Sequence, residues 1–387
     1  MNGQRKQEHN NRLVEWTKKK EGMRLKIVIP QANTHSNVAK EQHLVPRIYM
    51  KQWSYNDSNS VYIYEKAKPA DGVHSASVYS INYIIGYNDI KAGDIFVPDE
   101  ALEELFGFVA NQCIVYLDGE QLDSLKKLND KFYEFDSWEI YDKEGVLATK
   151  KEKNEIKRVI MQSRYTFIET EWCYQYEDSW IKFISALEKK IRSNKLRVLE
   201  KPVTLTSDEL EKLMEYIIIF DFRSINGNAW IKQIIDKILP YEIDSLDIPW
   251  KERTHNFNKT AGEELRHAGI VKASYEYLNH KNGKMRLLLD KYMENMGIKI
   301  CLSDETMPFI TSELPSQVVK NIDGYNEHIF VATPTMLITT YKTDNTNRYT
   351  VNYLKRKYVN RYNKYIAQNS SMIITKDALI NIENLLS

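Results

Sequence analysis

Helical periodicity fills the middle of this chain, and strand-forming residues flank it on both sides. Between residues 152 and 196, large apolar residues recur about every 3.6 positions, a spacing that places them on one face of a helix. They are Phe167, Trp172, Trp180, Phe183, Ile184 and Leu187. Further helices are predicted over 207–223, 259–278 and 285–296. A fold for this chain must therefore pack a helical middle against strands that come from both ends.

The strands are predicted from short runs of β-branched and aromatic residues. They cover 61–64 and 78–87 near the N-terminus, and 298–302, 309–311, 329–341 and 372–375 near the C-terminus. Pro334 is expected to bend the strand over 329–341. Helices are predicted over 99–110 and 350–368, and Lys376 and Asp377 are expected to begin a last one. This order indicates an α+β fold, with a mainly helical middle and a small mixed sheet built from N- and C-terminal strands.

The domain organisation is predicted to be simple. No repeat and no low-complexity linker divides the sequence, so we predict a single intertwined globular domain over 41–387. Residues 1–40 are largely polar and are predicted to be peripheral, with a charged helix over 12–26. Residues 118–160 are charged and low in apolar periodicity, which is typical of an insertion or a helical hairpin.

Opposite charges are almost balanced, with 54 Lys and Arg against 53 Asp and Glu and a formal net charge of +1. This balance gives no overall attraction for nucleic acid or an anionic membrane, so a polyanion site must come from local clustering. The apolar runs are too short to span a bilayer. Cys113, Cys173 and Cys301 lie far apart without zinc-site spacing, which is typical of reduced thiols. We expect a cytoplasmic protein with no membrane partner.

Residues 42–50, Gln-His-Leu-Val-Pro-Arg-Ile-Tyr-Met, place an imidazole and a guanidinium on either side of a proline. Pro46 fixes its own φ and pushes Val45 toward extended geometry. His43 and Arg47 therefore lie on a stiffened segment, which can hold an acid or base group beside a fixed cation.

Later stretches also set polar residues among apolar ones. They are Phe220–Ser224, which contains Arg223; Pro308–Pro315, which contains Thr311, Ser312 and Glu313; and 329–334 with the later Asn363. Together with residues 42–50 they resemble the domain-of-unknown-function family 4238, whose signature boxes read QH-x-VP-x-x-YL and PF-x-TSD-x-P. The resemblance covers roughly residues 41–375, and it implies a bacterial protein but names no reaction. Glu313 stands where the family has Asp, so its carboxylate reaches further.

These boxes supply one candidate active site. The predicted catalytic residues are His43, Glu313 and Arg223, and the predicted substrate-binding residues are Arg47, Thr311, Ser312 and Asn363. His43 would be the acid or base, Glu313 would hold a metal or a water, and the arginines would clamp phosphate. We expect His43, Arg223 and Glu313 to share one pocket about 10 Å across. The alternative is a buried polar network in which Arg223 pairs with Glu313 and His43 caps a helix.

A basic and aromatic helix is a second candidate, for nucleic acid. The predicted nucleic-acid-binding residues are Lys355, Arg356 and Lys357, and the same helix carries Arg361, Lys364, Tyr353, Tyr358, Tyr362 and Tyr365. Such a helix could hold a phosphate backbone and stack bases, or lie on the surface with its cations over the rings. His255 and His267 could ligate a metal with Glu263 or Glu264, but their spacing matches no metal motif and favours a solvated helix face.

The sequence favours an intracellular hydrolase for a phosphate-bearing substrate, nuclease-like and served by a divalent metal. Uncharacterised bacterial families often act as toxins or anti-phage effectors, and we expect such a role for this protein as well. The alternative is a non-catalytic regulatory protein that senses a nucleotide or a partner. A nucleic acid or nucleotide is the expected ligand, and a homo-oligomer or a defence-system partner protein stays open. Phosphate-binding P-loop, Rossmann and α/β-hydrolase motifs are absent from the sequence.

Overall fold

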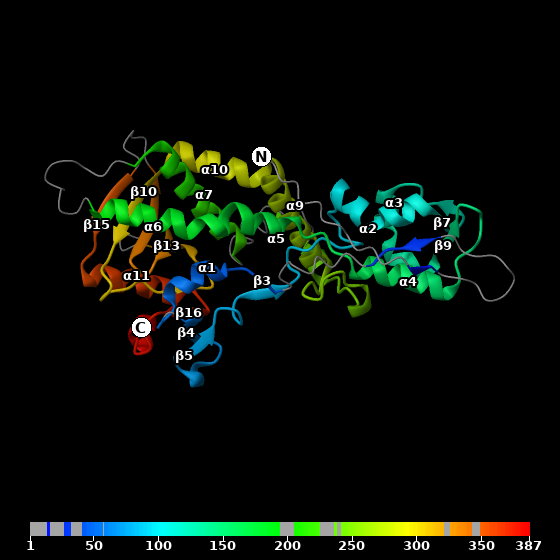
Figure 1. Cartoon of the computed structure of the whole chain (residues 1–387). Coiled ribbons are helices and arrows are strands. Elements are labelled where there is room, and N and C mark those ends of the chain that lie inside the picture. The colour runs from blue at the N-terminus through cyan, green and yellow to red at the C-terminus, as the bar shows by residue number, and fades with distance from the viewer. Residues whose placement is uncertain are drawn as a thin grey trace. The chain divides into compact units, whose positions relative to one another are not determined.

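A computed structural model of the protein describes residues 14–15, 27–31, 41–56, 58–193, 205–224, 236–237, 241–320, 326–342 and 349–387. The chain divides into two compact units, each assembled from separate chain segments (Figure 1). Unit 1 comprises Met1–Ala39, Tyr87–Glu169 and Leu239–Lys272, and unit 2 comprises Lys40–Gly86, Thr170–Ile238 and Ala273–Ser387. The sequence predicted one domain over 41–387, whereas this division separates two. The α+β class is confirmed.

Unit 1 mixes helices with short antiparallel strands. Its elements are α2 (Asp99–Gln112), β7 (Cys113–Leu117), β8 (Glu120–Gln121), α3 (Leu125–Asp130), β9 (Glu139–Asp142) and α4 (Lys150–Gln162). Strand β7 lies between β8 and β9, and β1 (Val14–Glu15) pairs with β2 (Val28–Ile29). A capping box of Thr149 and Glu152 starts α4. Buried aromatic residues such as Phe106, Phe135 and Trp138 fill the core.

Residues 118–160 are therefore strands and helices that contribute to the core of unit 1. They were predicted as an insertion or a helical hairpin, but they lie within the longer Tyr87–Glu169 segment of that unit. Most of the predicted peripheral segment, residues 1–40, lies outside the described residues. Its described part includes β1 at residues 14–15, inside the range predicted as a charged helix.

Unit 2 contains two main sheets. The first has the order β12 (Ser316–Lys320), β13 (Asn326–Thr333), β14 (Met336–Lys342), β10 (Met296–Leu302) and β15 (Tyr349–Tyr353). Only the β10–β15 pairing of this sheet is parallel. The second has the order β11 (Thr311–Ser312), β16 (Met372–Thr375), β4 (Ser60–Glu65) and β5 (His74–Ser77). N- and C-terminal strands share this second sheet, as the sequence predicted, but all of its pairings are antiparallel, whereas a mixed sheet was predicted.

The helices of unit 2 follow the predicted pattern closely. They include α1 (Arg47–Met50), α6 (Asp178–Ser193), α7 (Ser207–Arg223), α10 (Gly283–Asn295), α11 (Arg356–Asn369) and α12 (Ile382–Leu386). Helix α9 (Ala261–His280) continues from unit 1 into unit 2. A capping box of Thr206 and Glu209 begins α7 at the predicted residue. In the part of the chain that the structure describes, no helix is long and apolar enough to cross a membrane.

Several predicted boundaries are wrong in unit 2. The last helix begins at Ile382 rather than at Lys376 and Asp377, and the strand predicted over 78–87 is limited to β6 (Tyr83–Ile85). The chain reverses after Thr333, so the predicted bent strand is a hairpin of β13 and β14. The predicted helix over 350–368 begins later, at Arg356, because Tyr349–Tyr353 form β15 along β10. Tyr, Thr and Val suit a pleated, half-buried surface, and the neighbouring strand supplies hydrogen bonds that the sequence pattern alone does not reveal. Strand β15 therefore directly precedes α11 in the chain.

Candidate functional site

His43 and Arg223 meet in the interior of unit 2. Arg223, at the end of α7, donates a hydrogen bond from Nε to the backbone oxygen of His43, at 2.9 Å. Its Nη1 forms an ion pair with Glu177, and its guanidinium lies 6.0 Å from the ring centroid of Trp172. The Arg223 side chain is only 5% exposed. The Arg223 guanidinium is therefore held by protein groups, and its carboxylate partner is Glu177.

The His43 side chain is enclosed as well. Burial, reinforced by the nearby Arg47 cation, lowers the pKa of His43, so the imidazole is neutral at pH 7. Its Nε2 is buried without a hydrogen-bond partner among the described residues. A cavity bordered by Pro46, Glu177 and Arg223 measures about 10 Å³. That volume accommodates about one water molecule and no substrate.

Glu313 belongs to a different polar group. Its Oε1 accepts hydrogen bonds from the backbone nitrogen and hydroxyl of Ser371, at 2.6 and 2.7 Å, and its Oε2 accepts one from the nitrogen of Met372, at 2.9 Å. The carboxylate therefore fixes the start of β16. The alternative pairing of Glu313 with Arg223 is wrong, because Arg223 pairs with Glu177.

Arg47 begins α1, and its guanidinium lies 5.0 Å from the ring centroid of Tyr79. The other predicted substrate-binding residues hold the chain around 308–317. Thr311 Oγ1 lies 2.7 Å from the Tyr49 hydroxyl, and Ser312 Oγ accepts from the nitrogen of Leu314 at 3.0 Å. Asn363 accepts from the nitrogen of Ile310 at 3.1 Å and donates to the oxygen of Pro308 at 3.0 Å. Such contacts are structural, since each polar atom serves a neighbouring strand or turn. The catalytic and substrate-binding roles of these residues stay predictions.

The two histidines expected on a solvated helix face are buried in unit 1. His255 is 0% exposed and places Nε2 3.0 Å from Asp94, whereas His267 donates from Nε2 to the oxygen of Tyr87, at 2.7 Å. Burial lowers the pKa of His267 to about 4, so this imidazole stays neutral. The sequence could not show this, because the carboxylate partner lies 161 residues away from His255.

A network of hydrogen-bonding and titratable side chains that the sequence did not single out joins α7, α10, β12 and β13. Ser316 Oγ lies 2.6 Å from His328 Nε2, and His328 Nδ1 lies 3.1 Å from the Tyr292 hydroxyl. Asp221 also hydrogen-bonds Ser316, and burial raises the pKa of its carboxyl group to about 7. Burial lowers the pKa of His328 to about 4. The one signal in the sequence was the presence of Asp221 in the Phe220–Ser224 box.

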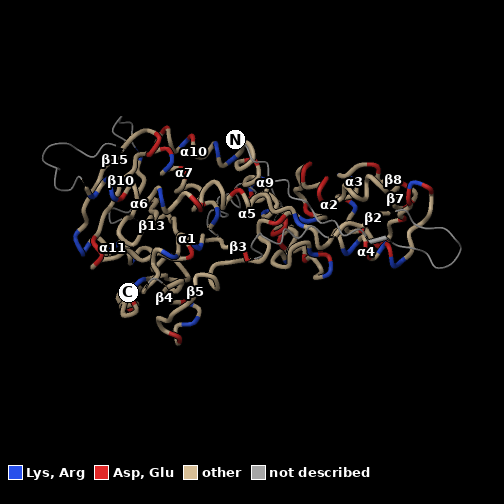
Figure 2. The backbone as a smooth tube through the Cα atoms, in the orientation of Figure 1, with Lys and Arg blue, Asp and Glu red and all other residues tan. Residues whose placement is uncertain are grey.

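A polar hollow of unit 2 is a cleft between α11 and the strands β10, β13 and β15. We call it the α11 cleft, and its volume is about 500 Å³. It is lined by the cations Lys299, Lys355, Lys357 and Arg361, by Tyr353, Tyr358, Tyr362 and Tyr365, and by Glu327, Asn352, Cys301 and Leu354. Figure 1 shows α11 close to these strands, and Figure 2 marks its Lys and Arg positions in blue.

The cations of the α11 cleft are available for a ligand. Among the described residues, no carboxylate lies within ion-pair distance of Lys299, Lys355, Lys357 or Arg361. Of the three residues predicted to bind nucleic acid, Lys355 and Lys357 line the cleft, and Arg356 is not among its lining residues. Arg361 and Lys299 complete the set, and Lys299 comes from β10 rather than from the predicted helix.

The tyrosines of the cleft divide into an outer and an inner pair. Tyr353 and Tyr358 are 38% and 37% exposed, and Lys357 Nζ and Arg361 Cζ lie 4.8 and 5.5 Å from the Tyr358 ring centroid. Deeper in, the Tyr362 hydroxyl donates to Glu327 Oε1 at 3.1 Å, and burial raises the pKa of Tyr362. The outer rings can stack on a ligand, and the inner hydroxyl stays protonated as a donor.

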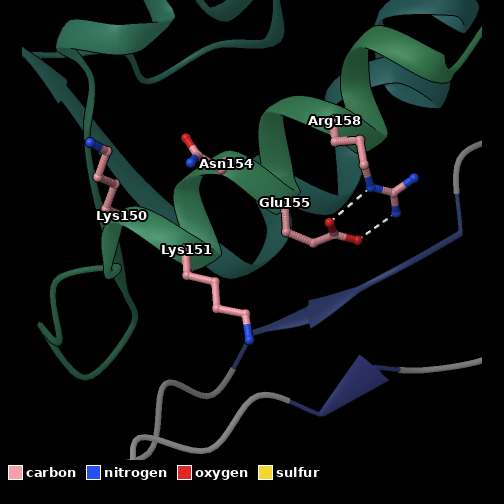
Figure 3. A pocket seen from close by; sticks show the side chains of 5 residues that line it. All are labelled: Lys150, Lys151, Asn154, Glu155 and Arg158. Carbon is pink, nitrogen blue, oxygen red and sulfur yellow. Dashed lines mark hydrogen bonds and ion pairs between the residues drawn. The ribbon is translucent and has the colours of Figure 1, made fainter.

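A second hollow, in unit 1, is a weaker candidate. It measures about 540 Å³ and is lined by Lys150, Lys151, Asn154, Glu155 and Arg158 (Figure 3). Arg158 points its Nε and Nη2 at Glu155, and its Nη1 donates to Gln162. The guanidinium is therefore occupied by its own helix, and no aromatic ring is present among the described lining residues.

Comparison with known proteins assigns the family and no activity. No curated protein matches the chain, and no solved structure does. The family model described as a protein of unknown function, DUF4238, matches residues 41–378. This match covers most of the 387 residues and includes the whole α11 cleft. The chain therefore belongs to the DUF4238 family.

Proposed function

We propose that this protein binds single-stranded nucleic acid in the α11 cleft. The observation that carries the proposal is the coincidence of cations without carboxylate partners and exposed tyrosine rings around one cleft of about 500 Å³. The near-neutral net charge of +1 makes this local cluster meaningful, because the rest of the chain offers no general attraction for polyanions.

The residue types match what an unpaired strand requires. Lysine and arginine attract phosphates and displace their counterions, and tyrosine rings stack on bases whatever the sequence. Arg361 adds a planar fork that can hold two phosphate oxygens. A volume of about 500 Å³ lies in the range of small-ligand sites, so it encloses about one nucleotide while its neighbours continue along the surface. A duplex presents no unstacked base and is expected to bind more weakly.

For the hydrolase expected from the sequence, the α11 cleft supports binding of the nucleic acid but not its cleavage. The carboxylate among the described lining residues is Glu327, and its Oε1 already accepts a hydrogen bond from Tyr362. His43 and Glu313, the residues expected to cleave, are held in the interior of unit 2. Cleavage, and a role as a toxin or anti-phage effector, therefore stay predictions, and a nucleotide-sensing role uses the same cleft without chemistry.

The proposal is tested by the salt dependence of binding. A fluorescent single-stranded 12-mer, as RNA and as DNA, is titrated with the full chain at several salt concentrations. The triple variant Lys355→Gln, Lys357→Gln, Arg361→Gln removes cleft cations, and Lys150→Gln, Lys151→Gln, Arg158→Gln is the matched control in unit 1. If each cleft cation contacts one phosphate, the slope of log K against log salt should flatten by about 2 in the cleft variant. The control should keep the wild-type slope.

Two outcomes would end the proposal. One is the lack of binding by any strand at low salt, and the other is an equal loss in the cleft variant and the unit 1 control. Circular dichroism of each variant verifies that the fold is intact. Incubating the same 12-mers with Mg²⁺ or Mn²⁺ and running them on a gel tests cleavage separately, so that binding without cleavage supports the recognition role alone.

A further inference from the structure

We infer that Glu327 selects the base that enters the α11 cleft and favours guanine. The inference rests on the proposed function and adds a specificity to it. The carboxylate of Glu327 lies among the four cations of a cleft that is otherwise suited to phosphates. A negative charge there weakens phosphate binding, so its position calls for a different contact.

The position of Glu327 separates it from the cations at the mouth of the cleft. Lys355 and Lys357 are exposed, whereas Glu327 is half-buried and lies in β13. Cys301, which lines the same cleft from β10, is fully buried. The exposed part of the cleft is therefore cationic, and its half-buried part holds Glu327 together with Lys299 and Arg361. A nucleotide that places its phosphates against Lys355 and Lys357 would direct its base toward Glu327.

The carboxylate is oriented and still has accepting capacity. Tyr362 donates to Oε1 at 3.1 Å, which fixes the plane of the group. Oε2 has no hydrogen-bond partner among the described residues, and it is not sealed from solvent. One oxygen is thus open, and the other retains a lone pair. A pair of parallel donors on the ligand would satisfy both.

Guanine is the base that offers such a pair. Its N1–H and N2–H lie side by side on the Watson–Crick edge, the edge that is free in a single strand. Adenine and cytosine present one amino group beside an acceptor nitrogen, which faces the carboxylate unfavourably. Uracil and thymine place one N–H between two carbonyl oxygens and are the poorest match. Glu327 therefore ranks guanine first and uracil or thymine last.

The test uses 7-mers of uridine with G, A, C or U at the central position, measured by fluorescence anisotropy at one low salt concentration. The wild-type chain should bind the G-centred strand about tenfold more tightly than the all-U strand. Glu327→Gln should lose most of this preference. Because a negative charge is removed, the variant should bind the all-U strand as tightly as the wild type or more tightly.

A control separates charge from recognition. Glu305→Gln removes one exposed carboxylate outside the cleft and should leave the G-to-U ratio unchanged. Free GMP added as a competitor distinguishes the source of the base: displacement at equal potency to the G-centred 7-mer would place a mononucleotide in the cleft instead of a strand.

The outcomes for the inference and the proposed function differ. If the wild type binds all four strands equally, or if Glu327→Gln changes every affinity by the same factor, base selection by Glu327 is wrong while nucleic-acid binding stands. If the chain prefers another base and keeps that preference in Glu327→Gln, selection of guanine by Glu327 is also wrong. If no strand binds, the proposed function itself fails.

Discussion

Replacing Asp221 with asparagine should stabilise the folded chain most strongly in mildly alkaline solution. Asp221 belongs to the network of Ser316, His328 and Tyr292, and burial raises the pKa of its carboxyl group from 3.8 to about 7. Asparagine is nearly isosteric and can still accept a hydrogen bond from Ser316, but it carries no charge. The substitution therefore isolates the cost of ionising a buried carboxyl group.

The sign and size follow from the two pKa values. The folded state holds its proton up to pH of about 7, whereas the unfolded state releases it near 3.8, so the free energy of unfolding falls as pH rises through this window. Each unit of pKa corresponds to roughly 1.4 kcal/mol. Between pH 5 and pH 8 the stability advantage of Asp221→Asn over wild type should grow by about 3 kcal/mol.

Urea unfolding followed by tryptophan fluorescence at pH 5, 6, 7 and 8 measures this difference. The pKa of His328 is lowered to about 4, and its titration affects wild type and variant alike, so it cancels. Asp208→Asn, an exposed aspartate in the first turn of the same helix, is the matched control and should show no such growth. Parallel stability curves for wild type and Asp221→Asn across this range would refute the buried-carboxyl reasoning.

Two further substitutions test residues of the signature boxes. His43→Ala should lower the melting temperature, because it empties a buried space beside Tyr83, and should leave nucleic-acid affinity within about twofold. An unchanged melting temperature with abolished activity would instead restore the catalytic role of His43. Glu313→Ala should cost about 2–4 kcal/mol in urea unfolding, since the nitrogens of Ser371 and Met372 lose their acceptor. A neutral effect on stability would contradict the structural role of Glu313.

Local patterns were sufficient for much of the fold. The start of α7 was predictable because Thr206, Asp208 and Glu209 carry their capping signal within a few residues of one another. The pairing of β4 with β16 was anticipated only as a shared sheet, since the register Ile63↔Ile374 depends on residues 311 positions apart. The strand β15 was missed for the same reason: its partner β10 is distant in sequence.

In the candidate site, too, residues could be predicted only where their sequence neighbours carried the signal. Lys355 and Lys357 could be singled out because cations and tyrosines alternate along one helix. Lys299 and Glu327, by contrast, reach the α11 cleft from strands β10 and β13, and nothing in their own neighbourhoods marks them. For His43 and Arg223 the polar pattern was correctly noticed, but only the three-dimensional contacts reveal that Glu177 and the backbone satisfy the guanidinium.

Photo-crosslinking locates bound nucleic acid on the chain, and so it tests directly whether the strand lies in the α11 cleft. A single-stranded RNA that carries 4-thiouridine is irradiated with the full protein, digested, and mapped by mass spectrometry. Crosslinks are expected at Tyr353 and Tyr358, the exposed rings of the α11 cleft, and they should be lost in the triple cation variant. Crosslinks confined to the Lys150–Arg158 hollow of unit 1, or spread evenly over the chain, would contradict binding in the α11 cleft.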